Sequence, residues 1–325
     1  MIAYVLRRAL YALPILLGVN VITFVLFFMV NTPDDMARMN LGVKHVTQEA
    51  IDKWKAERGY DKPLLVNRSA AGMKKLTETI FFEKSVGMFA FDFGRADDGR
   101  DIAREIRHRM GPSLAIALPV FAVGLAVNIT FALLMVFFRA SYLDFVGVVL
   151  CVAMMSISGL FYIIAGQYLV SKLWHLVPIS GFADGVDAVK FLVLPVAIGV
   201  VSGIGAGARW YRTLFLEEMS RDYVRTARAK GLSEAAVLFR HVLQNALIPI
   251  LTGAVVVIPL LFMGSLITES FFGIPGLGSY TIDAINAQDF AVVRAMVFLG
   301  SFLYIVGLVL TDISYTLVDP RIRLE

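Results

Sequence analysis

Long apolar runs separated by polar segments dominate the chain. The first run covers 21 residues, from Leu10 to Val30, and follows Arg7 and Arg8. It is too long for the apolar part of a signal peptide, which takes roughly 7–15 residues, and about as long as a membrane-spanning helix. No small-residue cleavage site follows it. We therefore expect residues 1–30 to form the N-terminal cytoplasmic end and a retained first span.

Five further apolar runs each approach the length of a span. Prolines within them are compatible with membrane helices, because neighbouring groups satisfy the freed backbone. The pattern predicts an all-α integral membrane protein with six transmembrane helices. The approximate bounds of the five runs are Ser113–Phe138, Phe145–Ser171, Phe191–Ala208, Ala246–Thr268 and Ala291–Thr311.

The segment 31–111, between the first two spans, has a different composition. It mixes 15 basic with 13 acidic residues and contains helical stretches such as "TQEAIDKWKAERGY". The stretch "DFGRADDGRD" predicts a turn-rich break within it. We expect a small extramembrane domain over 31–111, followed by a membrane core with the other five spans over 112–325.

Composition supports a membrane protein. Hydrophobic residues make up 58% of the chain, against roughly 45–50% in soluble domains. The formal net charge of +4 is too small to favour nucleic acid as a partner. The single cysteine, Cys151, lies inside an apolar run, so an internal disulfide is impossible and a buried apolar role is expected.

Basic residues in the short loops predict the orientation. With the N-terminus inside, the inner segments hold 12 of them, whereas the short outer loops and the start of the last span hold 3, namely Lys172, Lys190 and Arg294. The segment 31–111 is too long for the rule to apply. We expect both termini in the cytoplasm and 31–111 in the periplasm. The inner residues are Arg7, Arg8, Arg139, Arg209, Arg212, Arg221, Arg225, Arg228, Lys230, Arg240, Arg321 and Arg323.

Motifs for common chemistry are missing from the sequence. It contains no G-x-x-x-x-G-K-[ST] phosphate loop and no G-x-S-x-G nucleophile elbow, and its four histidines have no metal-ligand spacing. We therefore expect no catalytic, cofactor-binding or metal-binding residues in this chain. Gly199, Gly203 and Gly207 form a double G-x-x-x-G stripe, which predicts close packing of helices.

The predicted spans contain almost no charge, which disfavours a proton-coupled carrier because such carriers use acidic or histidine relays inside the membrane. Asn20, Asn128 and Gln167 are the polar exceptions. Hydrogen bonds between helices explain such residues in general. Lining of a pore by Asn128 or Gln167 is the alternative.

A basic segment interrupts the apolar runs between the fourth and fifth spans. Residues 217–230 predict a short helix, with acidic residues near its start and basic residues near its end, as the helix dipole favours. Gly231 follows where a left-handed residue ends a helix, and Ser233 is placed to cap the next one, with Glu234 in its first turn. The segment 214–245 thus predicts a stiff helix, corner and helix on the cytoplasmic side, rather than a solvated basic loop.

The stretch "YVRTARAKG", from Tyr223 to Gly231, resembles a cytoplasmic motif of permease subunits in binding-protein-dependent ABC importers. That motif reads E-A-A, three residues, glycine, nine residues and I-x-L-P. With its glycine on Gly231, the first three positions fall on Arg225, Thr226 and Ala227. The literal EAA at residues 234–236 has Arg240 where the glycine is required, so it is not the motif.

The form of this stretch is typical of the peptide and nickel branch of the family. The I-x-L-P end departs, since His241, Leu243 and Gln244 occupy those positions, but "HVLQNALIP" resembles the version of that branch. So do "YVLRRALYALPILLGVNVITFVLF", "FDFGR", "FLVLPVA", "ESFFGIPGLGSYTIDAI" and "VDPRIR". The chain reads "NTPDD" where the family has a P-G-D-P-like turn, and the stretch from Pro63 to Asp92 is longer than usual.

The resemblance implies an importer with two permeases, two ATPases and a periplasmic solute-binding protein. The second permease is expected to be a different chain, and ATP and magnesium belong to the ATPases. Membrane lipid surrounds the spans. An ion-coupled carrier or channel acting alone is the alternative function, and a membrane enzyme is a third. The residues expected to couple to an ATPase are Tyr223, Arg225, Thr226, Ala227, Lys230 and Gly231.

A second group is expected near the periplasmic mouth. It consists of Glu269, Phe271 and Phe272, ahead of a turn at Pro275 and Gly276. These residues are expected either to form an outer gate or to contact the binding protein. A plain aromatic belt at the membrane interface is the alternative.

Overall fold

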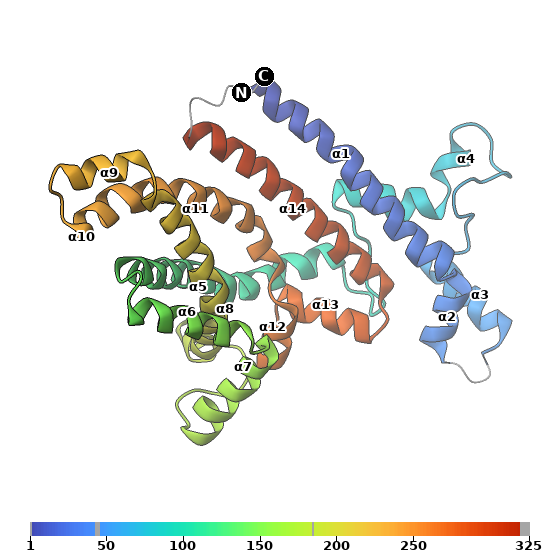
Figure 1. Ribbon diagram of the computed structural model, residues 1–325. Helices are drawn as coiled ribbons and strands as arrows, with labels where there is room; N and C mark the ends of the chain where they lie inside the picture. The colour runs from blue at the N-terminus through green and yellow to red at the C-terminus, as the bar shows by residue number, and fades with distance from the viewer. Residues whose placement is uncertain (1, 43–45, 184, 319–325) are drawn as a thin grey trace. The chain divides into compact units, whose positions relative to one another are not determined.

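The computed structural model describes residues 2–42, 46–183 and 185–318 (Figure 1). Helices make up most of these ranges, and their β-structure is one isolated bridge between Arg95 and Asp101. His45 and the basic residues Arg321 and Arg323, with the "DPRIR" part of the C-terminal match, lie outside the described residues. The expectation of an all-α protein is confirmed for the part of the chain that the structure describes.

Within the described residues, five helical segments are long and apolar enough to cross a membrane. A sixth is obtained if Tyr142–Met155 and Gly159–Leu173, which meet at an angle of 90°, count as one span. This bent pair covers the apolar run expected as one span at Phe145–Ser171. The five segments are Leu10–Val30, Ile102–Phe137, Gly185–Met219, Glu234–Met263 and Phe290–Ser314.

The chain divides into two compact units. Within the described residues, the first holds 2–109 and 280–309 and the second holds 110–279 and 310–318. We refer to them as the N-terminal unit and the core unit.

The N-terminal unit begins with α1 (Ile2–Phe24), continued by a π-helical segment η1 (Val25–Val30). After Thr32, which caps α2 (Pro33–Leu41) in a capping box with Asp35, the chain forms α3 (Gln48–Arg58). The expected helix in "TQEAIDKWKAERGY" is confirmed, and no helix forms in 92–101. Short elements complete this segment: α4 (Lys74–Thr77), η2 (Phe82–Val86) and η3 (Gly87–Ala90).

A buried aromatic cluster holds this unit together. Phe24 and Phe28 of the first span pack with Trp54 and Tyr60 from the segment after it. Asn20 is also buried, and its amide donates to the carbonyl oxygen of Ser85 at 3.0 Å. The first span is therefore tied to the polar segment by both apolar packing and a hydrogen bond.

The core unit is built from long helices and their connections. Its elements are α5 (Ile102–Phe137, from residue 110), α6 (Tyr142–Met155), α7 (Gly159–Gly166), η4 (Gln167–Leu173), η5 (Gly185–Asp187), α8 (Ala188–Met219), α9 (Asp222–Ala229), α10 (Glu234–Ala236), η6 (Val237–Val242), α11 (Leu243–Val257), η7 (Pro259–Met263) and α12 (Leu266–Phe272). Two further helices follow in the described residues, α13 (Leu277–Asn286) and α14 (Phe290–Val318).

Glycines allow α8 to approach its neighbours closely. A Cβ atom at Gly199 would collide with Val120 of α5, and one at Gly207 would collide with Asn128 of the same helix. Gly203 faces open space, whereas Gly205 packs against the backbone of Cys151 in α6. The packing expectation is confirmed for two of the three stripe residues. The expected burial of Cys151 is also confirmed.

One ion pair joins α6 to α8 beside this contact. The guanidinium of Arg212 donates to both carboxylate oxygens of Asp144, at 2.9 and 2.8 Å, and Asp144 is buried. Two parallel hydrogen bonds give such a pair a defined geometry. The pair fixes the rotation of α6 relative to α8. The count of basic residues along the sequence did not indicate this pair.

Candidate functional sites

The expected coupling segment forms two helices with a corner, but its first helix starts later than the sequence suggested. α8 continues to Met219, and α9 begins at Asp222. Glu217 and Glu218 therefore end α8 instead of opening the short helix, which makes that expectation wrong. Asp222 supplies the acidic residue in the first turn of α9.

The corner itself agrees with the sequence. Gly231 has a φ of +77°, in the left-handed region that favours glycine. The amide of Gly231 donates to the carbonyl of Arg228 at 2.9 Å, and that of Leu232 donates to the carbonyl of Ala227 at 3.3 Å. Ser233 then caps α10 by accepting from the amide of Ala236. Figure 1 shows α9 and α10 side by side, joined by this corner.

An ion pair braces the corner from outside. The Nε atom of Arg228 lies 2.8 Å from Oε1 of Glu234, and Arg139 approaches the other carboxylate oxygen at 3.8 Å. Glu234 belongs to the literal EAA at 234–236, which the motif alignment set aside. Glu234 stands six positions after Arg228, so no helical spacing indicated the pair.

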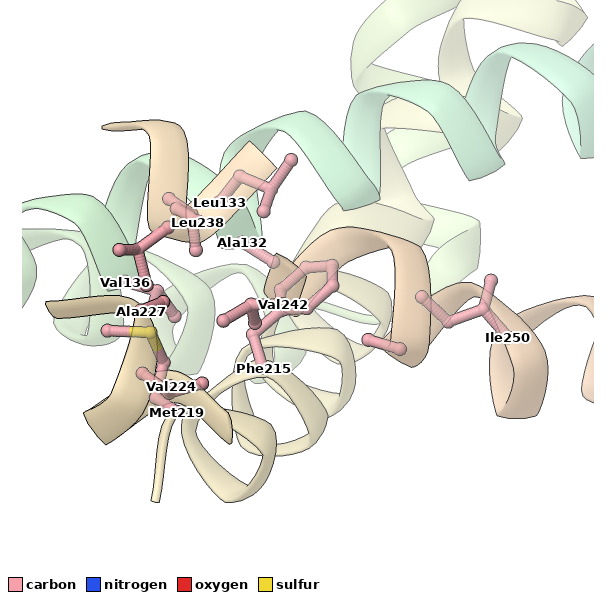
Figure 2. Close-up of a cluster of buried hydrophobic side chains, with 12 residues drawn as sticks. Ala132, Leu133, Val136, Phe215, Met219, Val224, Ala227, Leu238, Val242 and Ile250 are labelled. Atoms are coloured by element: carbon pink, nitrogen blue, oxygen red, sulfur yellow. The ribbon is translucent and has the colours of Figure 1, made fainter. Parts of the chain in front are cut away.

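One face of α9 is buried within the core unit. Val224 and Ala227 join an apolar cluster with side chains of α5, α8, η6 and α11 (Figure 2). Ala227 is only 5% exposed, so its side chain seats α9 on the chain and does not belong to an exposed contact surface. The cluster comprises Ala132, Leu133, Val136, Phe215, Met219, Val224, Ala227, Val237, Leu238, Val242, Ala246 and Ile250.

The opposite face of α9 is open. Arg225, Thr226 and Lys230 are exposed, and so is Gly231. Tyr223 is half-buried, and its hydroxyl donates to Oε2 of Glu218 at 2.6 Å. Burial and this hydrogen bond raise the pKa of Tyr223 to about 12. The helix therefore presents a basic, small-residue surface on a firmly packed base.

The second group of expected residues surrounds the carboxylate of Glu269, in α12. Oε1 accepts the hydroxyl of Ser113 at 2.8 Å and the amide of Ser265 at 3.1 Å. Oε2 accepts the amide of Ser279 at 3.1 Å. The Ser113 hydroxyl oxygen also accepts the amide of Leu277 at 2.8 Å. Burial raises the pKa of Glu269, and these donors oppose that shift.

The enclosure of Glu269 changes what this group can do. Glu269 has no exposed surface, so the expectation that it contacts a binding protein conflicts with its burial. It holds the loop 273–279 in place instead. Gly276 is buried, and a Cβ atom there would collide with the Glu269 carboxylate, whereas Pro275 is half-buried.

The two phenylalanines of α12 differ in their exposure to solvent. Phe272 is 1% exposed and packs in an apolar cluster with Ile116, Ile163 and Leu194. Phe271 is 43% exposed. An outer contact can therefore use Phe271 but not Phe272.

The polar residues of the spans have local partners or tight surroundings. Gln167 donates from its amide nitrogen to the carbonyl oxygens of Ile179 and Phe271, both at 3.0 Å. This amide joins the segment at Ile179 to the end of α12, which agrees with hydrogen bonding rather than lining of a pore. Asn128 packs against Gly207, and its side-chain oxygen has no hydrogen-bond partner in the described part of the chain.

A cavity of about 370 Å³ lies beside Glu269 in the core unit. Apolar residues of α5, α8, α11 and η7 form most of its wall, and Ser113, Thr268 and Glu269 add polar groups at one end. The volume and mostly apolar lining suit a small-molecule site with few orienting groups.

Comparison with known proteins agrees with a protein built from several apolar membrane helices. Residues 109–324 match the family described as the binding-protein-dependent transport system inner membrane component, and residues 1–87 match the N-terminal part of such membrane components. The chain belongs to this family of inner membrane transport components.

Its relatives share its full length. A Brucella abortus protein (strain 2308), assigned as a peptide transport system permease, is 33% identical over all of both chains. The dipeptide transport system permease protein DppB of Escherichia coli K12 is 28% identical, with 99% of each chain covered. The oligopeptide transport system permease protein AppB of Bacillus subtilis is 27% identical over 99% of this chain and 100% of its own.

Proposed function

We propose that this chain is the permease subunit of an ATP-driven importer and forms half of the path for a peptide-like solute. The observation that carries the proposal is the corner at Gly231, a left-handed turn that joins an exposed basic face to a buried apolar one. The names of the full-length relatives support a peptide-like solute.

The corner is suited to transmit motion into the spans. Val224 and Ala227 connect α9 to α5, α8 and α11 through one continuous cluster, so a push on α9 moves those helices rather than bending a loop. The exposed residues Arg225, Thr226 and Lys230, with Gly231, form the surface that docks in a groove of an ATPase subunit. Tyr223 and Ala227 act indirectly by fixing the position of this surface.

The proposed assembly contains two permeases, two ATPases and a periplasmic solute-binding protein. The second permease is a different chain, and ATP with magnesium is bound and hydrolysed by the ATPases. Both termini and the corner lie in the cytoplasm, and 31–111 forms a periplasmic domain. The basic residues of the short loops support this orientation.

The outer loop is assigned the gating role, which is one of the two roles expected for this group, and Glu269 is not assigned a direct contact with the binding protein. We assign Glu269 the task of holding 273–279 folded, since its carboxylate accepts donors from three parts of the core unit. Phe271, Pro275 and Gly276 then belong to one rigid outer element. Within it, Phe271 offers the exposed aromatic surface.

Uptake by reconstituted vesicles tests the function. We expect ATP-dependent accumulation of a peptide only when the ATPase subunits and a loaded binding protein are present. The variant Gly231→Asp should insert normally, lose co-purification with the ATPases and lose uptake. Uptake by the chain alone, driven by an ion gradient, would instead establish the carrier or channel.

A further inference from the structure

Arg294, near the start of α14, is a buried cation without a carboxylate partner. Arg294 is 3% exposed, and its Nε and Nη1 atoms make no hydrogen bond with the described residues. Among the described residues, no carboxylate lies within ion-pair distance of its guanidinium. The group lies over the ring of Phe28, with the guanidinium carbon 4.6 Å from the ring centre.

The nearby acidic residue does not satisfy this charge. Asp289 uses Oδ2 to accept the amide of Asp97 at 2.7 Å and Oδ1 to accept the amide of Val292 at 3.1 Å. Removing a charge from water without a close partner is unfavourable, so such groups are kept where they bind something. A cation–π contact with Phe28 offsets only a part of that cost.

Arg294 lines a polar cavity of about 630 Å³ in the N-terminal unit. Lys84 lines it too, and also has no ion pair among the described residues. Burial lowers the pKa of Lys84, and repulsion from Arg294 adds to that shift. Two cations therefore line one cavity, and Glu83 and Asp92 offset the burial of Lys84 and this repulsion only in part, because the pKa of Lys84 remains lowered.

The other charges of the cavity are of both signs. Arg58 is paired with Asp97 at 2.7 Å, and Glu83 is paired with Lys62. Glu57 and Asp92 line the cavity as further acidic groups. A ligand with a carboxylate at one end and an ammonium group at the other matches this distribution.

We propose that this cavity binds the terminal carboxylate of a small zwitterionic solute, through Arg294 and Lys84. A guanidinium recognises a carboxylate with two parallel hydrogen bonds, made by Nη2 together with either Nε or Nη1. Both Nε and Nη1 of Arg294 lack a partner among the described residues. Glu57 and Asp92 receive the ammonium end. The inference rests on the peptide-like solute proposed above, and it adds a site formed by the segment between the first two spans and by the start of α14.

Binding of dialanine to the full chain in phosphatidylcholine nanodiscs, followed by calorimetry, tests the proposal. Dialanine amide, which lacks the carboxylate, should bind at least ten-fold more weakly. Arg294→Met keeps an aliphatic side chain and removes the unpartnered charge, and it should weaken dialanine binding at least ten-fold. Lys84→Met provides a second variant, with the same expected direction, should Arg294→Met fail to fold.

The matched control is Arg68→Met, because Arg68 is an exposed arginine of the same unit that does not line the cavity. It should bind dialanine like the unmodified chain. Equal binding of dialanine and its amide, no binding of dialanine, or unchanged binding in both Arg294→Met and Lys84→Met would overturn the proposal.

A lipid phosphate shares the anionic chemistry, so the same titration is repeated in phosphatidylglycerol nanodiscs. Unchanged dialanine affinity is expected there, and its loss would assign the cavity to a lipid headgroup and overturn the proposal. These measurements need neither ATP nor ATPase subunits. Dialanine binding without ATP-driven uptake would reject the importer alone, whereas uptake without such binding would reject only this site.

Discussion

The guanidinium of Arg228 meets the carboxylate of Glu234 across the corner at Gly231, with 2.8 Å between Nε and Oε1. The pair connects the last turn of α9 with the first turn of α10. It therefore holds the two arms of the proposed coupling element at a defined angle, while the backbone at Gly231 makes the turn.

Exchange of these two charges should reveal the brace. Arg228→Glu and Glu234→Arg should each lower the thermal stability of the chain, and the double variant should recover most of the loss. Because both side chains are partly exposed, the coupling free energy should be about 0.2–1 kcal/mol. A double-mutant cycle on thermal unfolding measures it, and strictly additive effects would show that the pair contributes nothing.

Replacement of Gly231 by valine should impair coupling. A β-branched side chain at a φ of +77° is strained, at a cost of roughly 1–2 kcal/mol. Open space surrounds the position, so the strain comes from the backbone and not from a collision. ATP-driven uptake should fall by ten-fold or more while membrane insertion is retained. Ala229→Val, on exposed helical backbone two residues earlier, is the control and should transport normally.

Substitution by aspartate should affect stability at Ala227 and ATPase docking at Arg225. Ala227 is buried in the apolar cluster, so Ala227→Asp should destabilise the chain by about 3–5 kcal/mol, as an unpaired buried charge does. Arg225 is exposed, so Arg225→Asp should leave stability unchanged and weaken ATPase docking. Unfolding temperature and co-purification of the ATPases separate the two effects. Normal stability of Ala227→Asp would contradict the packing of α9.

Glu269→Gln should loosen the outer loop. Glutamine offers one acceptor oxygen where the carboxylate offers two, and its NH₂ group would face an amide donor of Ser265 or Ser279. An unsatisfied buried donor costs about 1–3 kcal/mol. The expected results are a lower unfolding temperature and faster proteolysis within 273–279. Ser270→Ala, at an exposed neighbouring position, should change neither the unfolding temperature nor the rate of proteolysis. Equal proteolysis of both variants would contradict the role of the Glu269 carboxylate in holding 273–279 folded.

Photo-crosslinking can distinguish the two phenylalanines of α12. A crosslinker in place of Phe271 should capture the binding protein in the transport cycle, because that side chain is 43% exposed. One in place of Phe272 should react within the chain, because Phe272 is buried. Products with lipid alone from position 271, in every nucleotide state, would favour an interfacial aromatic belt.

Local patterns in the sequence were sufficient for much of the architecture. Apolar runs near 20 residues identify membrane helices, because an unpaired backbone is costly in hydrocarbon and a helix pairs its own groups. The corner was also predictable, since the left-handed turn at Gly231 and the cap at Ser233 depend on residues next to them in the chain. Where neighbouring residues gave no stop signal, the prediction failed, as at Glu217 and Glu218, which extend α8.

Tertiary structure alone decided which side chains face outward and which long-range pairs form. Ala227 and Phe272 were expected at contact surfaces, yet packing against distant helices buries both. Ser113 reaches Glu269 across 156 positions of sequence, and no spacing rule connects them. The enclosure of Arg294 likewise depends on how α14 packs with Phe28. Periodicity specifies a local conformation and its apolar face, whereas burial and partner choice depend on which other segment covers that face, and that is determined only when the whole chain packs.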